Sequence, residues 1–402
     1  MASVNLMVVQ GGGPTAVLNA SLAAIVSEAQ GHPEIRRILG SRDGILGLLR
    51  EDVSDLTLLS EAKLQQLRRT PGAALGSSRH KPTEAELDVL AATLHRFDIG
   101  YLLFVGGNGT MHGARLISSF LQSIGLGIAV VGIPKTVDND LVQTDRCPGF
   151  ASAARYLAAS TRELGADLRS LPQPVTILET MGRSVGWLAA STVLAQAEGN
   201  GAPHLVCIPE IPFETGSFLA ELDRIVRSNG YAVVVVAEGI ANANGDPVYQ
   251  SLDQSQTDAL NRPMVDGVAQ HLAGIVSQQL GIRCRNEKPG LLGRSSIALA
   301  SEQDRADAAL VGRAGVQALV SGQRDTMVSL QPLSGGLTPG FRMVPLAECA
   351  GHERPIPAKW LQTGPIPVKQ AFREYLEPLV GMLDQHLVDL PRATVPEGDN
   401  IQ

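Results

Sequence analysis

The most chemically distinctive stretch of this sequence is VGIPKTVDND, residues 131–140. It continues an apolar run, IAVV, that begins at Ile128. It then brings a lysine and two acids together, at Lys135, Asp138 and Asp140. A carboxylate can take a proton from a hydroxyl group or bind a hard cation, and an ammonium group can bind an anion. Taken alone, the same residues also suit an Asx-rich turn that caps a helix.

Three glycine-rich turns, each at the end of an apolar run, form a second group of residues suited to chemistry. They lie at Gly11–Gly13, Gly106–Gly109 and Gly132–Lys135. Glycine lets the backbone approach a ligand closely, and the helix after such a turn directs unpaired N–H groups at an anion. Any one of these turns can equally serve only to tighten a strand–helix connection. Three of them beside charged residues favour a cradle for phosphate.

The elements that must position these residues are short apolar segments that alternate with helical stretches. Runs such as YLLFV and AVVVV are apolar at every position, which predicts parallel strands covered by helices on both faces. Regular alternation of strand and helix predicts a doubly wound α/β fold, in which ligands bind at the carboxyl ends of the strands. The expected strands are 5–10, 99–105, 128–131, 174–180, 204–208 and 231–237.

Composition limits the class of protein. The length of 402 residues favours two domains, and the 44% of hydrophobic and 18% of charged residues are typical of a globular protein. A net charge of −7 disfavours a nucleic-acid binder but does not exclude an anionic substrate. The four cysteines form no CxxC pair, so neither a zinc site nor a disulfide framework is indicated. We expect a cytoplasmic protein with no signal peptide and no membrane-spanning segment.

Seven motifs, in one order, resemble those of the phosphofructokinases. They are GGGPTAVLNA, PGAALGSSR, GGNGT, PKTVDND, ETMGRSVG, AEG and PGLLGR, and the resemblance extends to about residue 320. It is closest to the pyrophosphate-using branch, which often carries PKT where many ATP-using members carry PGT. The resemblance implies two Rossmann-like α/β domains that enclose the active site. It also implies transfer of a phosphoryl group from ATP or pyrophosphate to the 1-hydroxyl of fructose 6-phosphate with Mg²⁺, by a homodimer or homotetramer.

The resemblance implies a role for each matching residue. Asp138 would be the base for the sugar hydroxyl, and Asp140 would hold Mg²⁺, with Asn108 as a poorer metal ligand. Thr136 would donate to the sugar or the transferring phosphoryl group, and Lys135 would meet the donor phosphate. The catalytic set is Asp138, Thr136, Lys135 and Arg183. The donor set is Gly12, Arg79, Gly107, Asn108, Gly109 and Thr110. The sugar-phosphate set is Thr136, Asp138, Asp140, Met181, Gly182, Arg183, Glu238, Arg285 and Arg294.

The residues that distinguish the two donors conflict. Neither Asn108 nor Gly109 supplies the carboxylate that relatives carry in this turn. Gly109 also lacks the side chain that, in pyrophosphate users, fills the space a nucleotide needs, which favours ATP. Lys135 favours pyrophosphate, although some ATP-using members combine that glycine with that lysine. On balance we expect ATP by a small margin, with pyrophosphate as the alternative.

The acceptor site also departs from the family pattern. A sugar-site arginine of many ATP-using relatives is Pro174 here, and relatives often show histidine or tyrosine where this chain has Leu291 and Leu292. Fructose 6-phosphate is favoured, and a related sugar phosphate stays open. A kinase of the NAD-kinase or lipid-kinase type is disfavoured because such enzymes lack PKTVDND and ETMGRSVG. A non-catalytic phosphate sensor is disfavoured because it gains nothing from two acids beside the phosphates.

The expected domains are discontinuous. Residues 1–150 with about 293–355 would form the donor domain, and residues 151–292 with about 356–402 the sugar-phosphate domain. A late helix carries an apolar stripe and also Lys369, Arg373 and Tyr375, and in relatives a tyrosine and a basic residue of such a helix help to hold the sugar phosphate. The physiological direction of the reaction and any allosteric effectors stay open at this point.

Overall fold

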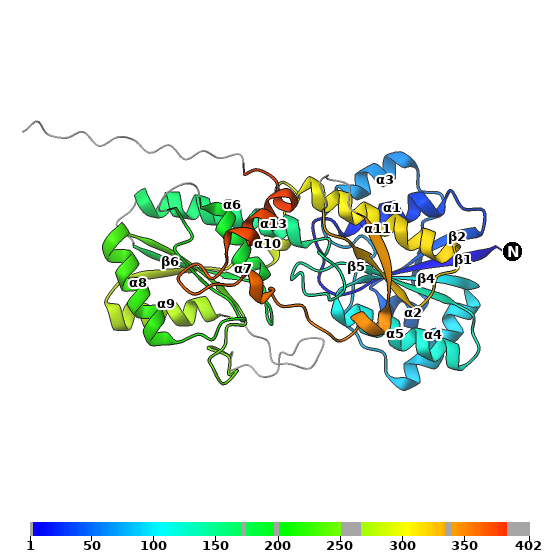
Figure 1. The fold of residues 1–402 in the computed structure, drawn as a ribbon. Helices are drawn as coiled ribbons and strands as arrows, with labels where there is room; N and C mark the ends of the chain where they lie inside the picture. Colours follow the sequence, from blue (N-terminus) through cyan, green and yellow to red (C-terminus); the bar gives the residue numbers. More distant parts are fainter. Residues whose placement is uncertain (1–2, 171–173, 197–200, 251–266, 334–339, 384–402) are drawn as a thin grey trace, which may run out of the picture.

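The computed structural model describes residues 3–170, 174–196, 201–250, 267–333 and 340–383. They form two lobes, each built around its own sheet (Figure 1). The doubly wound α/β fold that the alternating pattern predicts is confirmed.

The larger lobe contains a seven-stranded sheet with the strand order β11-β10-β5-β4-β1-β2-β3. The strands are β1 (Val4–Gln10), β2 (Ile35–Ser41), β3 (Val53–Asp55), β4 (Ile99–Gly106), β5 (Ala129–Pro134), β10 (Thr326–Leu330) and β11 (Phe341–Pro345). Its centre is parallel, but β3 and β11 pair antiparallel at the two edges. The sequence pattern does not predict β2, β3, β10 or β11, because charged or polar residues interrupt their apolar runs.

Helices cover both faces of this sheet. Side chains alternate across β1, so that Leu6 and Val8 pack on one face while Met7 and Val9 pack on the other. Figure 1 shows α1, α3 and α11 over one face and α2, α4 and α5 over the other. Their bounds are α1 (Leu18–Ala29), α2 (Ile45–Arg50), α3 (Glu61–Arg68), α4 (Glu84–Arg96), α5 (Asn108–Ser123) and α11 (Glu302–Val320).

The smaller lobe contains a four-stranded, wholly parallel sheet with the order β7-β8-β6-β9. The strands are β6 (Val175–Thr180), β7 (Leu205–Cys207), β8 (Ala232–Ala237) and β9 (Cys284–Glu287). The run AVVVVA is buried along its whole length, as its pattern predicts. The helices of this lobe are α6 (Phe150–Ser170), α7 (Trp187–Ser191), the 3₁₀ turn η1 (Thr192–Ala195), α8 (Thr215–Asn229), α9 (Val268–Leu280) and α13 (Gln370–Val380).

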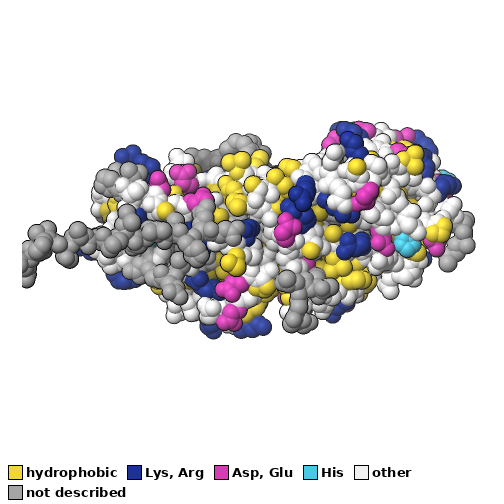
Figure 2. Space-filling model, turned by 90° about the horizontal axis from the view of Figure 1, so that it is seen from above, with side chains coloured by type: hydrophobic (Ala, Val, Ile, Leu, Met, Phe, Trp, Pro, Cys, Tyr) yellow, Lys and Arg dark blue, Asp and Glu magenta, His cyan; other side chains and the backbone are white. Residues whose placement is uncertain are grey.

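The chain crosses between the lobes more than once. After β9, the short α10 (Leu291–Ser295) leads to α11, which packs on α1 in the larger lobe. After α12 (Leu346–Cys349), the chain passes through the 3₁₀ turn η2 (Ala358–Trp360) and reaches α13 on the smaller lobe. Seen from above, the lobes form one elongated body with hydrophobic side chains gathered near its middle (Figure 2).

The discontinuous domain division expected from the sequence stays a prediction, although the strands of the two sheets can be placed along the chain. The strands of the seven-stranded sheet lie within 1–150 and 293–355, and those of the four-stranded sheet lie within 151–292. The boundaries themselves stay a prediction. None of the described helices is both long enough and apolar enough to span a membrane.

Candidate active site

A cavity of about 530 Å³ lies where the carboxyl ends of the strands of both sheets meet. This is the position at which open parallel sheets bind ligands. Most of the residues that the sequence singles out line it. They are Gly12, Arg79, Gly107, Asn108, Gly109, Thr110, Lys135, Thr136, Asp138, Asp140, Met181, Arg183, Glu238 and Arg294.

The glycine-rich turns form one wall of the cavity. Gly12 has a positive φ of 76°, which a residue with a side chain adopts only with strain. Gly107 is the N-cap residue of α5 and supplies no capping side chain. The first N–H groups of a helix have no acceptor within it, and here the residues that carry them, Asn108 and Gly109, line the cavity. The N-terminus of α5 therefore offers amide donors and a favourable dipole to an anion.

Lys135 joins two of the glycine-rich turns. Its side chain is buried, and its Nζ donates to the carbonyl oxygens of Gly11 at 3.0 Å and Gly13 at 2.7 Å. An ammonium group has three donors, so one remains for a ligand in the cavity. Burial and the nearby positive charge of Arg294 lower the pKa of Lys135 to about 8, although Asp138 and other acids act in the opposite direction. The lysine is thus a fixed positive charge beneath the phosphate cradle.

The backbone of the segment DND explains why two acids lie together. Asn139 adopts a left-handed backbone with φ of 56°, a conformation that asparagine tolerates better than most residues. Its side chain is buried, and its Oδ1 accepts from the backbone N–H of Cys147 at 2.9 Å. Asp138 and Asp140, on either side of it, both line the cavity. Asn139 therefore holds the backbone in place, and Asp138 and Asp140 face the cavity, where they can contact a ligand.

The two acids are held in an environment that opposes their charge. Burial is the largest cause that raises the pKa of Asp138 to about 8, and the negative charges of Asp140 and Glu238 add to it. Lys135 acts in the opposite direction but does not offset these effects. Burial likewise raises the pKa of Asp140, although a hydrogen bond from Asn108 lowers it in part. A carboxylate with a raised pKa is a stronger base than an ordinary aspartate, and perturbed acids of this kind are typical of functional sites.

The oxygens of this acidic group suit a hard cation. Asn108 donates from Nδ2 to Oδ2 of Asp140 at 2.8 Å, which orients both side chains. Three further oxygens, Oδ1 of Asn108, Asp138 and Asp140, are buried and accept no hydrogen bond in the described part of the chain. Mg²⁺ binds such oxygens and completes its shell with water and phosphate. Asp140 and Asn108 would hold the metal, and this role stays a prediction.

The other wall of the cavity comes from the smaller lobe and α10. Met181 and Arg183 follow β6, and Glu238 follows β8. A Cβ on Gly239 would fall 1.6 Å from the carbonyl oxygen of Arg183, so only glycine allows these two strand ends to approach so closely. Arg294 lies across the cavity, with its Nη1 only 2.6 Å from where a Cβ on Gly13 would be. Arg294 therefore lies beside the glycine-rich turn Gly11–Gly13, and it also lines the cavity that Met181, Arg183 and Glu238 line.

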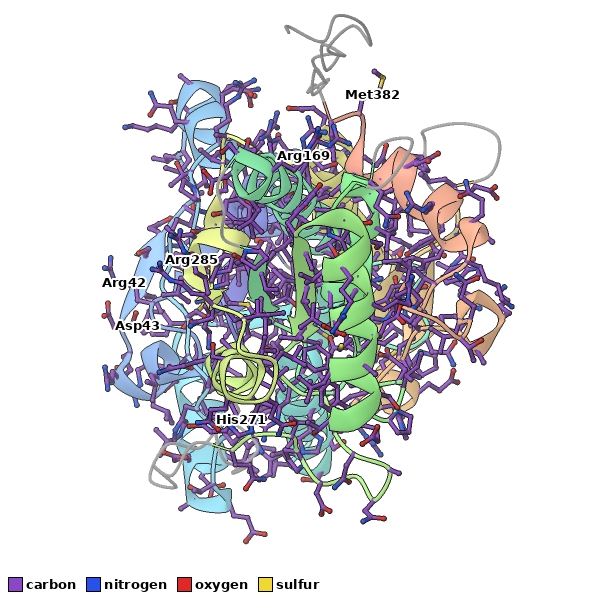
Figure 3. The ribbon with its side chains drawn as sticks, turned by 90° about the vertical axis from the view of Figure 1, so that its left-hand side faces the viewer. Arg42, Asp43, Arg169, His271, Arg285 and Met382 are labelled. Carbon is purple, nitrogen blue, oxygen red and sulfur yellow. The ribbon has the colours of Figure 1, made fainter. Side chains whose placement is uncertain are left out.

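Two residues of the predicted sugar-phosphate set lie outside the cavity lining. Gly182 forms the turn after β6 with φ of 128° but is not itself exposed to the cavity. Arg285 is exposed on β9, the edge strand of the smaller sheet, and Figure 3 labels it in the left half of the view, on the same side as Arg42 and Asp43. Arg285 and Arg294 are nine residues apart, but Arg285 lies on β9 and Arg294 on α10, so their side chains reach different places. The spacing in the sequence does not reveal this difference. A role for Arg285 in this chain's own cavity is not supported.

The late helix is also placed differently from the expectation. None of Lys369, Arg373 and Tyr375 lines the cavity. The hydroxyl of Tyr375 donates to the carbonyl oxygen of Asp145 at 2.8 Å, and Lys369 Nζ donates to the carbonyl oxygen of Lys359 at 3.1 Å. The tyrosine thus supports the loop that carries the acids rather than a ligand.

Sequence reasoning missed several cavity residues. Glu353 lies in a segment without periodicity, yet it lines the cavity, and its charge raises the pKa of Asp138 and of Asp140. Lys288 also lines it and pairs with the buried carboxylate of Glu179 at 3.0 Å. Lys288 directly precedes the motif PGLLGR, and this neighbourhood could have indicated from the sequence that it belongs to the site. The other missed lining residues are Ser78, His80, Lys81, Val137, Ser184, Val185 and Gly290. Gly13 and Leu291, which the sequence analysis names, also line the cavity.

The far end of the acidic loop is anchored by a buried acid of α11. Asp304 accepts from the backbone N–H of Gly149 at 2.8 Å and of Ser152 at 3.0 Å, at the start of α6. Burial nevertheless raises the pKa of Asp304 from 3.8 to about 6. An acid whose pKa is raised by folding contributes stability that is full below its unfolded pKa and is lost as the pH rises through its folded pKa.

We therefore expect Asp304→Asn to change the pH dependence of stability. The free-energy advantage of wild type over the variant should fall by about 2–3 kcal/mol between roughly pH 4 and pH 7, since one pKa unit corresponds to about 1.4 kcal/mol. Urea unfolding of both proteins at several pH values measures this difference. A difference that stays constant with pH would show that Asp304 does not titrate in this range.

Comparison with known proteins identifies the family. The family model described as phosphofructokinase matches residues 5–319. Four bacterial proteins named pyrophosphate–fructose 6-phosphate 1-phosphotransferase are 33–36% identical to this chain. The one from Xanthomonas campestris pv. campestris is 36% identical over 393 residues, which cover 94% of this chain and 92% of that protein. A sulfofructose kinase from Alkalicoccus urumqiensis is 31% identical and covers 93% of this chain and 94% of its own length. ATP-dependent 6-phosphofructokinases are also similar, at 29–34% identity.

Solved structures agree with the sequence matches. The crystal structure of a pyrophosphate-dependent phosphofructokinase from Nitrosospira multiformis matches with a TM-score of 0.86 and 33% identity, covering 96% of this chain and 94% of that chain. The corresponding protein from Marinobacter aquaeolei matches with a TM-score of 0.84 and 34% identity, covering 97% and 95%. This chain belongs to the phosphofructokinase family and is an enzyme of that type.

Proposed function

We propose that this enzyme transfers a phosphoryl group from pyrophosphate to the 1-hydroxyl of fructose 6-phosphate, giving fructose 1,6-bisphosphate and releasing orthophosphate. The observation that carries the choice of donor is the set of four relatives named for pyrophosphate, each of which aligns with 94% of this chain. The expectation from the sequence, ATP by a small margin, is not supported by these relatives. Its stated alternative fits them better.

The buried position of Lys135 is a physical reason for the same choice. Its Nζ is held between the carbonyl oxygens of Gly11 and Gly13, so its side chain occupies the floor of the donor turns. A compact donor that presents only phosphate oxygens can use this charge directly. Gly109, by contrast, leaves open space, because a Cβ built there meets no atom within 4 Å. That open space at Gly109 suits a nucleotide.

In the proposed reaction, each wall of the cavity has its own task. The amides at the start of α5, together with Gly12, Arg79 and Lys135, would hold the donor phosphates and neutralise their charge. Asp138 would accept the proton of the sugar hydroxyl as that oxygen attacks the phosphorus atom. Thr136 would hydrogen-bond the transferring group, and Arg183 would stabilise its charge.

The remaining roles follow from position. Asp140 and Asn108 would bind Mg²⁺, which when bound shields the charge of the phosphates. Met181, Glu238 and Arg294 would hold the sugar phosphate. Fructose 6-phosphate is the acceptor named for the four relatives, and a related sugar carrying an anionic group stays the alternative because Pro174, Leu291 and Leu292 depart from the family pattern. A homodimer or homotetramer stays a prediction.

Turnover with pure donors tests the proposal. With fructose 6-phosphate and Mg²⁺, we expect the purified enzyme to use pyrophosphate with a higher kcat/KM than ATP. A higher kcat/KM with ATP would overturn the donor, and no turnover of fructose 6-phosphate with either donor would overturn the acceptor.

The open space at Gly109 gives a second prediction on the donor. Gly109→Asp should lower kcat/KM for ATP more than for pyrophosphate, because the new side chain would occupy the space that only a nucleotide needs. Gly113→Ala, on the same helix, is a matched control, since a Cβ there meets its nearest atom at an ordinary 3.8 Å. Equal losses with both donors would contradict this account of the space.

A further inference from the structure

Arg354 makes several hydrogen bonds to the acid-bearing loop, which is the segment 135–149 between β5 and α6 that carries Asp138 and Asp140. It lies in the irregular segment between α12 and η2, next to the cavity residue Glu353. Its Nη1 donates to the carbonyl oxygens of Thr144 at 2.8 Å and Asp145 at 2.6 Å. Its Nε and Nη2 both donate to the carbonyl oxygen of Asn139, at 3.3 Å and 3.2 Å. One guanidinium group thus bonds both the Asn139 end and the Thr144–Asp145 end of the loop.

The backbone of Arg354 continues the same attachment. Its N–H donates to the carbonyl oxygen of Asp140 at 2.8 Å, and Glu353 forms an antiparallel bridge with Leu141. Arg354 therefore holds the carbonyls of two consecutive residues, Asn139 and Asp140. Because a peptide unit is planar, fixing a carbonyl also fixes the N–H and Cα of the next residue. These contacts set the direction in which the side chain of Asp140 leaves the backbone, and they hold the segment that follows Asp138 directly.

The opposite side of Arg354 is attached to the smaller lobe. Its guanidinium lies 4.5 Å from the centre of the Trp187 ring, a cation–π contact, and Trp187 Nε1 donates to its carbonyl oxygen at 2.9 Å. Trp187 is completely buried at the start of α7, in the segment that follows Arg183. It packs against Phe372 and Tyr375 of α13. The loop of the acids is thus tied, through one side chain, to the core that carries the sugar-side residues.

We propose that Arg354 is a positioning residue that orients Asp140, and through the adjoining Asn139 the backbone next to Asp138, relative to the sugar side of the cavity. It does not line the cavity and touches no reacting atom. Its effect comes through the carbonyls of residues 139 and 140 and through Trp187. The identity of the reaction rests on the function proposed above, but the geometric role does not.

The test compares Arg354→Gln with a matched variant elsewhere. Within the described part of the chain, Arg162 also donates to backbone carbonyls, those of Ala195, Leu194 and Leu383, at 3.1–3.2 Å, and none of these residues belongs to the acid-bearing loop. We expect Arg354→Gln to lower kcat by about 10²-fold, with the KM values for both substrates within about 3-fold of wild type, since a displacement of about 1 Å can have that effect. Arg162→Gln should lose thermal stability to a similar degree and keep its kcat. Arg354→Lys should recover part of the rate.

A second measurement does not depend on the substrate. Hydrogen exchange followed by mass spectrometry should show at least about 10-fold faster exchange in a peptide covering residues 137–149 of Arg354→Gln, and not in the same peptide of Arg162→Gln. Equal kcat in both variants, or a loss confined to KM, would overturn the positioning role. So would unchanged exchange in that peptide. If wild type fails to use pyrophosphate, the proposed donor falls, and the exchange experiment still decides the role of Arg354.

Discussion

Replacement of Asp138 by asparagine is expected to lower kcat by about 10²–10⁴-fold, the contribution of a positioned general base. The change keeps the size of the side chain and removes only its ability to take the proton of the sugar hydroxyl. Asp138 lies beside Asp140 at the cavity, and burial raises its pKa to about 8, which makes it a strong base for this step. Steady-state rates with pyrophosphate and fructose 6-phosphate measure the effect, and calorimetric binding of fructose 6-phosphate should stay close to normal.

Stability separates loss of chemistry from loss of fold in this variant. The pKa of Asp138 is raised by burial and by like charges, so at neutral pH folding must either bury the ionised carboxylate or protonate it, and both oppose folding. An asparagine carries no such cost, and the melting temperature of Asp138→Asn should be equal to or higher than that of wild type at neutral pH. A rate within a few-fold of wild type would remove Asp138 from the mechanism. A sharp drop in melting temperature would show that the carboxylate has a structural role instead.

Regular elements and the residues at their ends could be predicted from the sequence. All-apolar runs reveal the buried central strands, and the residues directly after such a run must lie at the ligand-binding edge of a parallel sheet. For this reason the pattern places Gly12, Asn108, Asp138, Met181 and Glu238 at one site, and all five line the cavity. Their chemical roles stay predictions, because geometry alone does not measure a rate.

The rest of the site could not be predicted because it depends on segments without a period. Glu353 and Arg354 follow no strand and belong to no amphipathic helix, so nothing in their spacing indicates that they meet residues more than 200 positions earlier. Arg285 shows the opposite error. A motif places it in a family pattern, but the position of β9 at the edge of its sheet decides where its side chain goes. Long-range packing, which the local pattern does not carry, determines both outcomes.

Replacement of Lys135 by methionine is expected to lower kcat/KM for pyrophosphate by about 10²–10³-fold, as does loss of one preorganised electrostatic group in other active sites. Methionine is similar in length and apolar, so it fills the buried space while removing the positive charge. The KM for fructose 6-phosphate should change little, because the lysine contacts the donor turns at Gly11 and Gly13. Initial rates at varied concentrations of each substrate distinguish these two effects.

The variant also removes two hydrogen bonds that hold the donor turn, so a second variant must account for a looser turn. Ser77→Ala is suited to this, because Ser77 Oγ donates to the carbonyl oxygen of Gly12 at 2.6 Å and carries no charge. If the charge of Lys135 acts on the donor, Ser77→Ala should lower kcat/KM for pyrophosphate by less than about 10-fold, the equivalent of one ordinary hydrogen bond. Equal losses in the two variants would mean that Lys135 serves to hold the turn. A loss confined to the KM for fructose 6-phosphate would move the lysine to the acceptor site, and the buried cation could then no longer account for the choice of pyrophosphate.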